Sequence, residues 1–118
     1  MARKDNLGRR GEDYAAAFLT DAGYRLVERN WRCPQGEIDI VAERAGEVVF
    51  VEVKTRSSLA FGHPFEAITA AKLARLRRLA AAWCEQSPVR PQRIRIDAIA
   101  VTAPPGVPPV IEHRRGVF

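Results

Sequence analysis

The sequence of 118 residues predicts an α/β fold in the order helix, three strands, helix, strand. Apolar residues recur at helical spacing in two segments, residues 8–22 and 70–85. Alternating or continuous apolar stretches typical of strands occupy residues 25–32, 36–54 (two strands joined by a turn) and 93–101. Because the chain is long enough to bury a core of its own, it is expected to form one domain.

The first helix is predicted over residues 8–22, where an apolar stripe recurs at helical spacing: Ala15, Phe18, Leu19 and Ala22. Asp5 or Asn6 is expected to cap the start of this helix, and Gly23 to end it in a left-handed conformation. Residues 1–6 are then expected to form a flexible start to the domain 1–118.

The segment GEIDIVAERAGEVVFVEVK predicts two apolar strands joined by a tight turn at Ala45–Gly46. A two-residue loop pairs positions whose numbers add up to 91, which sets Asp39 opposite Glu52 and Glu37 opposite Lys54. Glu37 is then expected to restrain the lysine rather than to bind a metal.

The facing of Asp39 and Glu52 matters because opposed Cβ atoms lie about 4.5–5.5 Å apart, where two carboxylates repel. A divalent cation would offset that cost, and carboxylate oxygens together with the Val53 carbonyl suit Mg²⁺ or Mn²⁺. Lys54 would orient an attacking water or stabilise charge developing on a phosphorane. A three-residue loop would instead set Val51 opposite Asp39. The other interpretation is a surface strand bearing an ordinary ion pair, because Glu-x-Lys is common on strands.

The second helix is predicted over residues 70–85, capped by Thr69 and preceded by a helical turn that begins at Pro64. Its charged residues include a basic stripe at intervals of three: Lys72, Arg75 and Arg78. Such a stripe is either a solvated face or a face that contacts phosphates, and the sequence leaves both interpretations open.

Residues 93–101 predict a buried strand, in which the lone acid Asp97 is expected to be a hydrogen-bonded structural group. Residues 103–118 predict a Pro-rich connector, a short edge strand at 110–113 and a basic tail. His113 is expected to be an ordinary edge histidine. A second copy of the chain could pair with this edge, which leaves a homodimer open.

The overall charge favours a polyanionic partner, since the formal net charge is +5 and the pI is near 9.9. Cys33 and Cys84 form no metal-binding or disulfide pattern, which is typical of reduced thiols in a cytoplasmic protein. The chain shows neither a signal peptide nor an apolar stretch long enough to cross a membrane, so no membrane association is expected.

Six motifs occur along the chain in the order seen in the bacterial YraN-like family of small uncharacterised proteins, which the sequence resembles over nearly its whole length: GRRGE (8–12), GYRLVERNWR (23–32), GEIDIVA (36–42), FVEVKTR (50–56), FGHPFEAITAAK (61–72) and RIDAIAV (95–101). That family is similar to Holliday-junction resolvases within the restriction-endonuclease-like, PD-(D/E)xK, superfamily. The resemblance implies an αβββαβ core with a mixed sheet between helices.

The resemblance also implies site residues. Asp39, Glu52 and Lys54 fall on the acid and E-x-K positions of the superfamily, and Glu12 falls on an acid of the first helix that often completes such sites. From the residues alone, Glu12 would be a solvated first-turn glutamate that favours the helix dipole. Ile38 stands where the superfamily motif often has proline.

The sequence therefore predicts a metal-dependent endonuclease that hydrolyses DNA, with Mg²⁺ or Mn²⁺ as cofactor and branched or repair-related DNA as the expected substrate. An alternative is a nucleic-acid-binding module that has the fold but does not cleave. A third possibility is a protein-interaction or assembly factor, which would use the Pro-rich segment and the Arg-rich tail.

Overall fold

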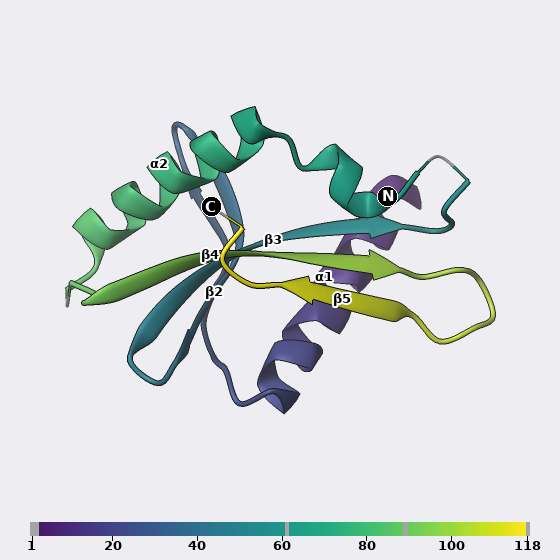
Figure 1. The fold of residues 1–118 in the computed structure, drawn as a ribbon, viewed down its shortest axis with the longest axis horizontal. Coiled ribbons are helices and arrows are strands. Elements are labelled where there is room, and N and C mark those ends of the chain that lie inside the picture. The colour runs from purple at the N-terminus through teal and green to yellow at the C-terminus, as the bar shows by residue number, and fades with distance from the viewer. Residues whose placement is uncertain (1–2, 61, 89, 118) are drawn as a thin grey trace.

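The computed structural model describes residues 3–60, 62–88 and 90–117, with the side chains of residues 3–5 excepted. Its elements follow the predicted order: α1 (Arg3–Asp21), β1 (Arg25–Cys33), β2 (Gly36–Arg44), β3 (Glu47–Arg56), the short 3-10 helix η1 (Pro64–Ala67), α2 (Ala70–Gln86), β4 (Arg93–Thr102) and β5 (Val110–Arg114). Figure 1 shows the two helices on either side of one central sheet. The predicted αβββαβ core is confirmed.

The sheet contains five strands in the order β1-β2-β3-β4-β5. Only β3 and β4 run parallel, joined by a crossover through η1 and α2, and every other neighbouring pair is antiparallel. The sheet is thus mixed, as expected, with β5 as the predicted edge strand beside β4. Within the described residues, no helix combines the length and the apolar character needed to cross a bilayer.

Each face of the sheet carries its own apolar core. Alternating residues of β3 divide between these cores: Val49 and Val51 pack with Leu19 of α1, whereas Val48 and Phe50 pack with α2. The α2 core also holds both tryptophans, Trp31 and Trp83. Because β3 contributes to both cores, as β2 and β4 also do, the sheet fixes the two helices relative to each other.

The start of α1 differs from the prediction. The helix begins at Arg3, so residues 3–6 are helical rather than a flexible start, and Asp5 and Asn6 lie inside the helix instead of capping it. No proline interrupts this stretch, and Arg, Lys and Leu are good helix formers, so the helix extends beyond the apolar stripe. Residues 1 and 2 lie outside the described residues. Gly23 ends the helix with φ of +90°, as predicted.

The β2–β3 hairpin has the predicted two-residue loop. Ala45 and Gly46 both have positive φ, 53° and 78°, which is the backbone of a type I′ turn. The observed pairs, from Arg44 with Glu47 to Ile40 with Val51, keep the predicted register. The predicted loop of two residues, and the register that follows from it, are therefore confirmed.

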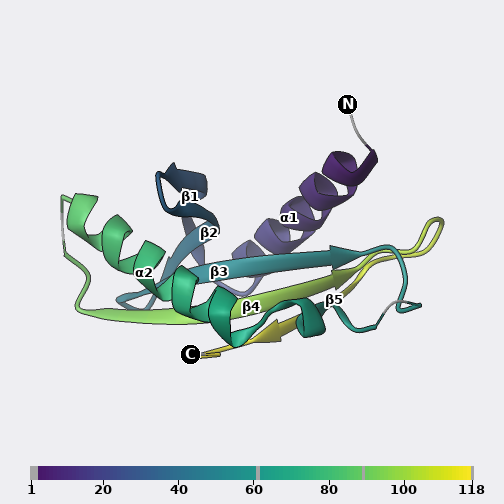
Figure 2. The same ribbon diagram turned by 90° about the horizontal axis from the view of Figure 1, so that it is seen from above.

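The pairing of β2 with β3 stops at Ile40 and Val51, one step before Asp39 would meet Glu52. Ile38 packs in the α2 core and Ile40 in the α1 core, although two residues this far apart on a regular strand share a face. Regular alternation thus fails around Asp39. Figure 2 shows this part of the β1–β2 hairpin rising away from the plane of β3, β4 and β5.

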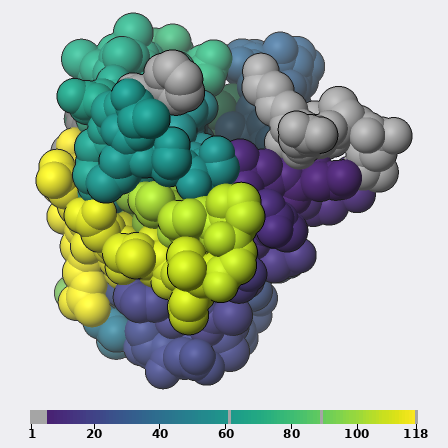
Figure 3. Space-filling view, turned by 90° about the vertical axis from the view of Figure 1, so that its right-hand side faces the viewer, coloured from purple at the N-terminus to yellow at the C-terminus, as the bar shows by residue number. Residues whose placement is uncertain are grey.

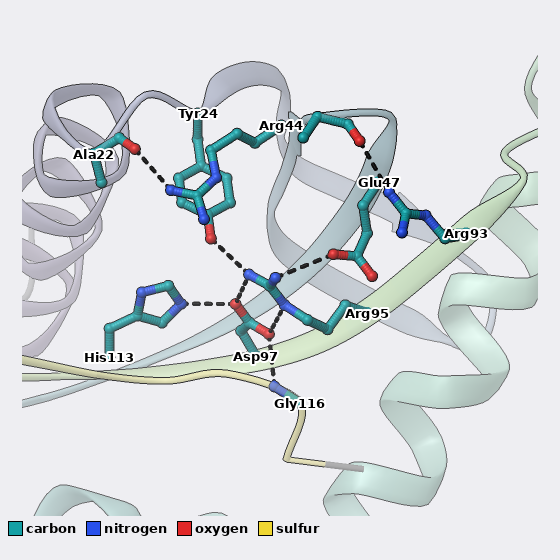
Figure 4. A network of polar contacts seen from close by, with 10 residues as sticks. Ala22, Tyr24, Arg44, Glu47, Arg93, Arg95, Asp97, His113 and Gly116 are labelled. Carbon is teal, nitrogen blue, oxygen red and sulfur yellow. Dashed lines mark hydrogen bonds and ion pairs between the residues drawn. The ribbon is translucent and has the colours of Figure 1, made fainter.

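A buried polar network beneath α1 holds the other end of the sheet together (Figure 4). Asp97 has no exposed surface and accepts hydrogen bonds from Arg95, His113 and the Gly116 amide, at 2.7 to 2.9 Å. Arg95 also donates to the Tyr24 hydroxyl. The structural role predicted for Asp97 is confirmed, but His113 is no ordinary edge histidine, since its side chain is 7% exposed and directed inward.

Candidate acid and lysine site

The carboxyl groups of Asp39 and Glu52 come together where β2 leaves β3. Asp39 Oδ2 accepts a hydrogen bond of 2.8 Å from the Val53 amide, in the place where the ladder would have a backbone carbonyl. This bond explains why the regular pairing ends, because a side chain occupies the next donor on β3. The two acids therefore meet through their side chains and not as the predicted backbone pair.

Both acids resist ionisation. Burial, and then the negative charge of Glu52, raise the pKa of Asp39 to about 8. Burial also raises the pKa of Glu52, although a hydrogen bond with Asp39 and the nearby Lys54 act against that rise. Two carboxyl groups that disfavour each other's charge in a partly buried place form a site that a cation would stabilise.

Lys54 lies on the same face of β3 as Glu52, two residues further along the strand. Burial lowers the pKa of Lys54, and the positive charges of Lys72 and Arg56 lower it further. Glu52 and Asp39 act on it in the opposite sense, which places the ammonium within electrostatic reach of the acid pair. The structure thus brings together the acid, the glutamate and the lysine that the sequence singled out.

Glu12 approaches the same place from α1. The adjacent Gly11 is buried, and a Cβ added to it would lie 1.8 Å from Thr55 Oγ1, so the helix rests directly on β3 at this point. Burial raises the pKa of Glu12, Arg29 opposes that rise from 3.8 Å away, and Glu37 adds to it. Glu12 is half-buried here. The solvated glutamate that the residue pattern alone predicts is therefore wrong.

Glu37 does not lie opposite Lys54, because the β2–β3 ladder ends before reaching them. Its carboxylate instead pairs with Arg32 of β1, at 2.6 Å, and the two residues are partners in the β1–β2 register. The predicted restraint of the lysine by Glu37 is wrong. The charge of Glu37 nonetheless raises the pKa of both Asp39 and Glu12, so this residue lies beside the acid cluster.

The basic stripe of α2 lies partly over the acids. Arg75 and Lys72 are among the positive charges that act against the raised pKa of Glu52. Arg78 lies further along the same helix and is exposed. The start of the stripe therefore faces the acid pair, and its continuation leads away along α2.

The donor set fits a hard divalent cation. Asp39 and Glu52 supply carboxylate oxygens, and Mg²⁺ is commonly bound by one or two carboxylates with water completing its shell. The N–H and C=O of one strand residue point to the same side, so the Val53 carbonyl faces Asp39 as its amide does. In the described part of the chain, no three His, Cys, Asp or Glu side chains gather as ligands. The expected set of Asp39, Glu52 and the Val53 carbonyl needs no third side chain.

Two residues that support this site are missing from the sequence-based prediction. Asn30 has φ of 53°, and its side chain hydrogen-bonds Glu12, so a strained backbone on β1 helps to hold that carboxyl group. Gly11 permits the close approach of α1. A glycine inside a helical pattern, next to an acid, is the one signal that pointed to a close contact.

Comparisons with known proteins bear on nearly the whole chain. The profile described as Uncharacterised protein family UPF0102 matches residues 11–101. Three proteins named UPF0102 protein, from Arthrobacter sp., Clavibacter michiganensis and Nocardia farcinica, are 56%, 54% and 50% identical to this chain. These matches cover 99%, 95% and 98% of this chain, and 99%, 95% and 91% of the respective relatives.

Proposed function

The chain belongs to the uncharacterised protein family UPF0102, and we propose from its site that it is a metal-dependent endonuclease acting on DNA, of the PD-(D/E)xK type. One observation carries the proposal: Asp39 and Glu52 are pressed together, partly buried, with Lys54 on the same strand face. Carboxyl groups whose pKa values are strongly raised occur more often at functional sites than elsewhere, because holding them together destabilises the fold. The expected place of action is the cytoplasm.

In this proposal Asp39, Glu52 and the Val53 carbonyl hold Mg²⁺ or Mn²⁺. The cation, when bound, would polarise the phosphodiester and make a bound water more acidic. The Val53 amide fixes Asp39 in position. Lys54 orients the attacking water and offsets negative charge developing on the phosphorane. Glu12, at the edge of the site, accepts a proton from water.

The DNA backbone would run over the start of α2. Lys72 and Arg75 lie close enough to Glu52 to alter its pKa, so a phosphate contacting them lies near the acid pair. Arg78 extends the same path along the helix. One face then carries both the charges for binding and the acids. Branched or repair-related DNA, which the family resemblance implies, is the substrate class to test first.

The experiment is cleavage of duplex, single-stranded and four-way-junction DNA with Mg²⁺ or Mn²⁺. We expect cleavage of at least one substrate, lost in Asp39→Asn and in Glu52→Gln. Glu85→Gln, an exposed acid on α2, is the matched control and should cleave like the wild type. Cleavage that survives in both acid variants would show that the site is assigned to the wrong residues.

A second candidate is a nucleic-acid-binding module without cleavage. It is favoured by the cations already around Glu52, because Lys54, Lys72 and Arg75 offset part of the negative charge without any metal. In that case DNA binding should fall steeply with added salt and be indifferent to chelator. A chelator-sensitive affinity would favour the metal site instead. A docking role for the tail or the Pro-rich segment is the third and weakest candidate.

A further inference from the structure

A hollow of about 350 Å³ opens next to the acid pair, between the first half of α1 and the last residues of β3. Gly8 and Glu12 line it from the helix, and Lys54, Arg56 and Ser57 line it from the strand and the turn after it. Figure 3 shows the corresponding face, where the start of α1 (purple) lies beside the segment that follows β3 (teal).

Arg56, which lines this hollow, has an incompletely satisfied guanidinium. Its Nε atom is buried and has no hydrogen-bond partner within the described residues. A buried donor without an acceptor costs about 1–3 kcal/mol. One explanation for such an atom is a ligand that accepts its hydrogen bond when bound.

Positive charge concentrates at the same place. The charges of Lys72 and Arg56 both lower the pKa of Lys54, so the three cations lie within electrostatic reach of one another. None of the three takes part in an ion pair among residues 6–60, 62–88 and 90–117. Three cations that form no ion pair attract an anion, although the acid pair lies within electrostatic reach of Lys54.

The edge of β3 is also open here. β2 leaves β3 after Val51, and the Val53 amide, which faces that side, is taken by Asp39. By the alternation of the strand, the Thr55 amide faces the same side, beyond the end of the ladder. Thr55 also lines the hollow. An oxygen-rich group in the hollow would thus meet a backbone N–H as well as the guanidinium.

We propose that this hollow is a phosphate subsite, in which Arg56 and the Thr55 amide bind one phosphate group of the strand whose neighbouring phosphodiester lies at the acid pair. Lys54 lies between the two positions. Glu12 lines the same hollow from α1. The inference rests on the proposed nuclease function and adds to it the residues that position the DNA strand.

The test measures binding without metal, so it is independent of cleavage. Fluorescence anisotropy in chelator gives the affinity of wild type and Arg56→Gln for a labelled DNA strand over a range of salt. We expect Arg56→Gln to bind about tenfold more weakly and to lose about 0.7 from the slope of log K against log salt, the value of one phosphate contact on a single strand. Arg25→Gln removes an exposed positive charge at the opposite end of the sheet and should change neither quantity.

Strands with and without a 5′-phosphate distinguish the two sources of the phosphate. A wild-type preference for the phosphorylated strand that Arg56→Gln loses assigns a terminal phosphate. Equal affinity for both strands, with the loss in Arg56→Gln retained, assigns an internal phosphodiester. Wild-type affinity and slope in Arg56→Gln overturn the subsite.

A measurement on the wild type covers the case in which Arg56→Gln does not fold. Titration with inorganic phosphate should shift the NMR signals of the Arg56 Nε–H and the Thr55 amide, and unchanged signals overturn the subsite. Binding through Arg56 by a protein that never cleaves DNA would refute the nuclease proposal alone. Cleavage with an Arg56-independent affinity would refute the subsite alone.

Discussion

At the scale of single residues, Asp39 makes the site sensitive to pH. An unfolded aspartate has a pKa of about 4, whereas burial and then the charge of Glu52 raise the pKa of Asp39 in the folded protein to about 8. The folded state therefore keeps a proton that the unfolded state has lost, so the stabilisation is complete below about pH 4 and disappears as the pH rises towards about 8. We expect the metal-free protein to lose unfolding free energy over this range, by up to about 1.4 kcal/mol per pH unit, measured by urea denaturation in chelator.

Asp39→Asn should flatten this dependence and be more stable than the wild type at alkaline pH, since its amide oxygen still accepts the Val53 hydrogen bond and no charge is buried. Mg²⁺ should restore the stability of the wild type at alkaline pH but have no effect on the variant. Glu85→Gln should follow the wild type at every pH. An equally steep curve in Asp39→Asn would show that another group is responsible.

The pKa of Asp97 is shifted in the opposite direction to that of Asp39. Burial alone would raise its pKa, but hydrogen bonds from His113, Arg95 and the Gly116 amide outweigh burial and lower the pKa to about 2. Its contribution to stability is therefore present above about pH 4 and is lost as the pH falls towards about 2. Asp97→Asn should cost about 3 kcal/mol at neutral pH, because it removes the buried carboxylate that Arg95 and His113 share and leaves Arg95 with Glu47 as its only charged partner among the described residues.

Chemical denaturation at neutral pH measures this loss. Asp13→Asn, which removes an exposed acid that also contacts an arginine, is the control and should cost less than about 1 kcal/mol. Equal effects of the two substitutions would mean that the buried network contributes no more than a surface ion pair.

At the scale of elements, the β2–β3 turn stores strain that can be removed. Ala45 has φ of 53°, a left-handed conformation that costs a residue with a Cβ atom about 1 kcal/mol. Ala45→Asn creates the Asn-Gly pair preferred in type I′ turns, so we expect a gain of about 0.5–1 kcal/mol in the free energy of unfolding. Ala17→Asn, at an exposed helical position, should destabilise instead. A loss of stability in Ala45→Asn would contradict the turn type.

Two glycines of α1 test how the helix places Glu12. Gly11→Ala would drive a Cβ into Thr55 of β3, whereas Gly8→Ala meets nothing within 4 Å. We expect Gly8→Ala to stabilise by about 1 kcal/mol, as alanine does inside helices, and Gly11→Ala to destabilise by about 1–3 kcal/mol. Thermal unfolding compares them, and a stabilising Gly11→Ala would mean that α1 does not rest on β3 at this point.

At the scale of the whole molecule, local signals determine the fold and long-range contacts determine the site. The hairpin register follows from the turn residues Ala45 and Gly46, so the sequence is sufficient to bring Asp39 close to Glu52. The exchange of a ladder bond for the Asp39 side chain has no local pattern. The partner of Glu37 could not be predicted from the hairpin either, because Arg32 comes from a third strand.

Local and long-range information differ in the same way for charge. The composition gives the total charge, whereas the fold determines where the charged side chains lie. The net charge of +5 favours any polyanion, but only a local concentration of cations produces a site. Reversing Lys72, Arg75 and Arg78 to Glu should abolish DNA binding, because these residues form the basic stripe that begins beside Glu52. Anisotropy with labelled DNA at several salt concentrations measures the loss.

The matched control reverses three exposed arginines elsewhere to Glu: Arg25, Arg90 and Arg93. Both triple variants lower the net charge by the same amount, so a binding mode governed by total charge would weaken equally in the two proteins. Binding through the α2 face should instead be lost in the first variant and largely retained in the second, with a salt slope close to that of the wild type. Equal losses would therefore assign DNA binding to the charge of the whole protein, and would remove the basic stripe from the proposed path of the strand.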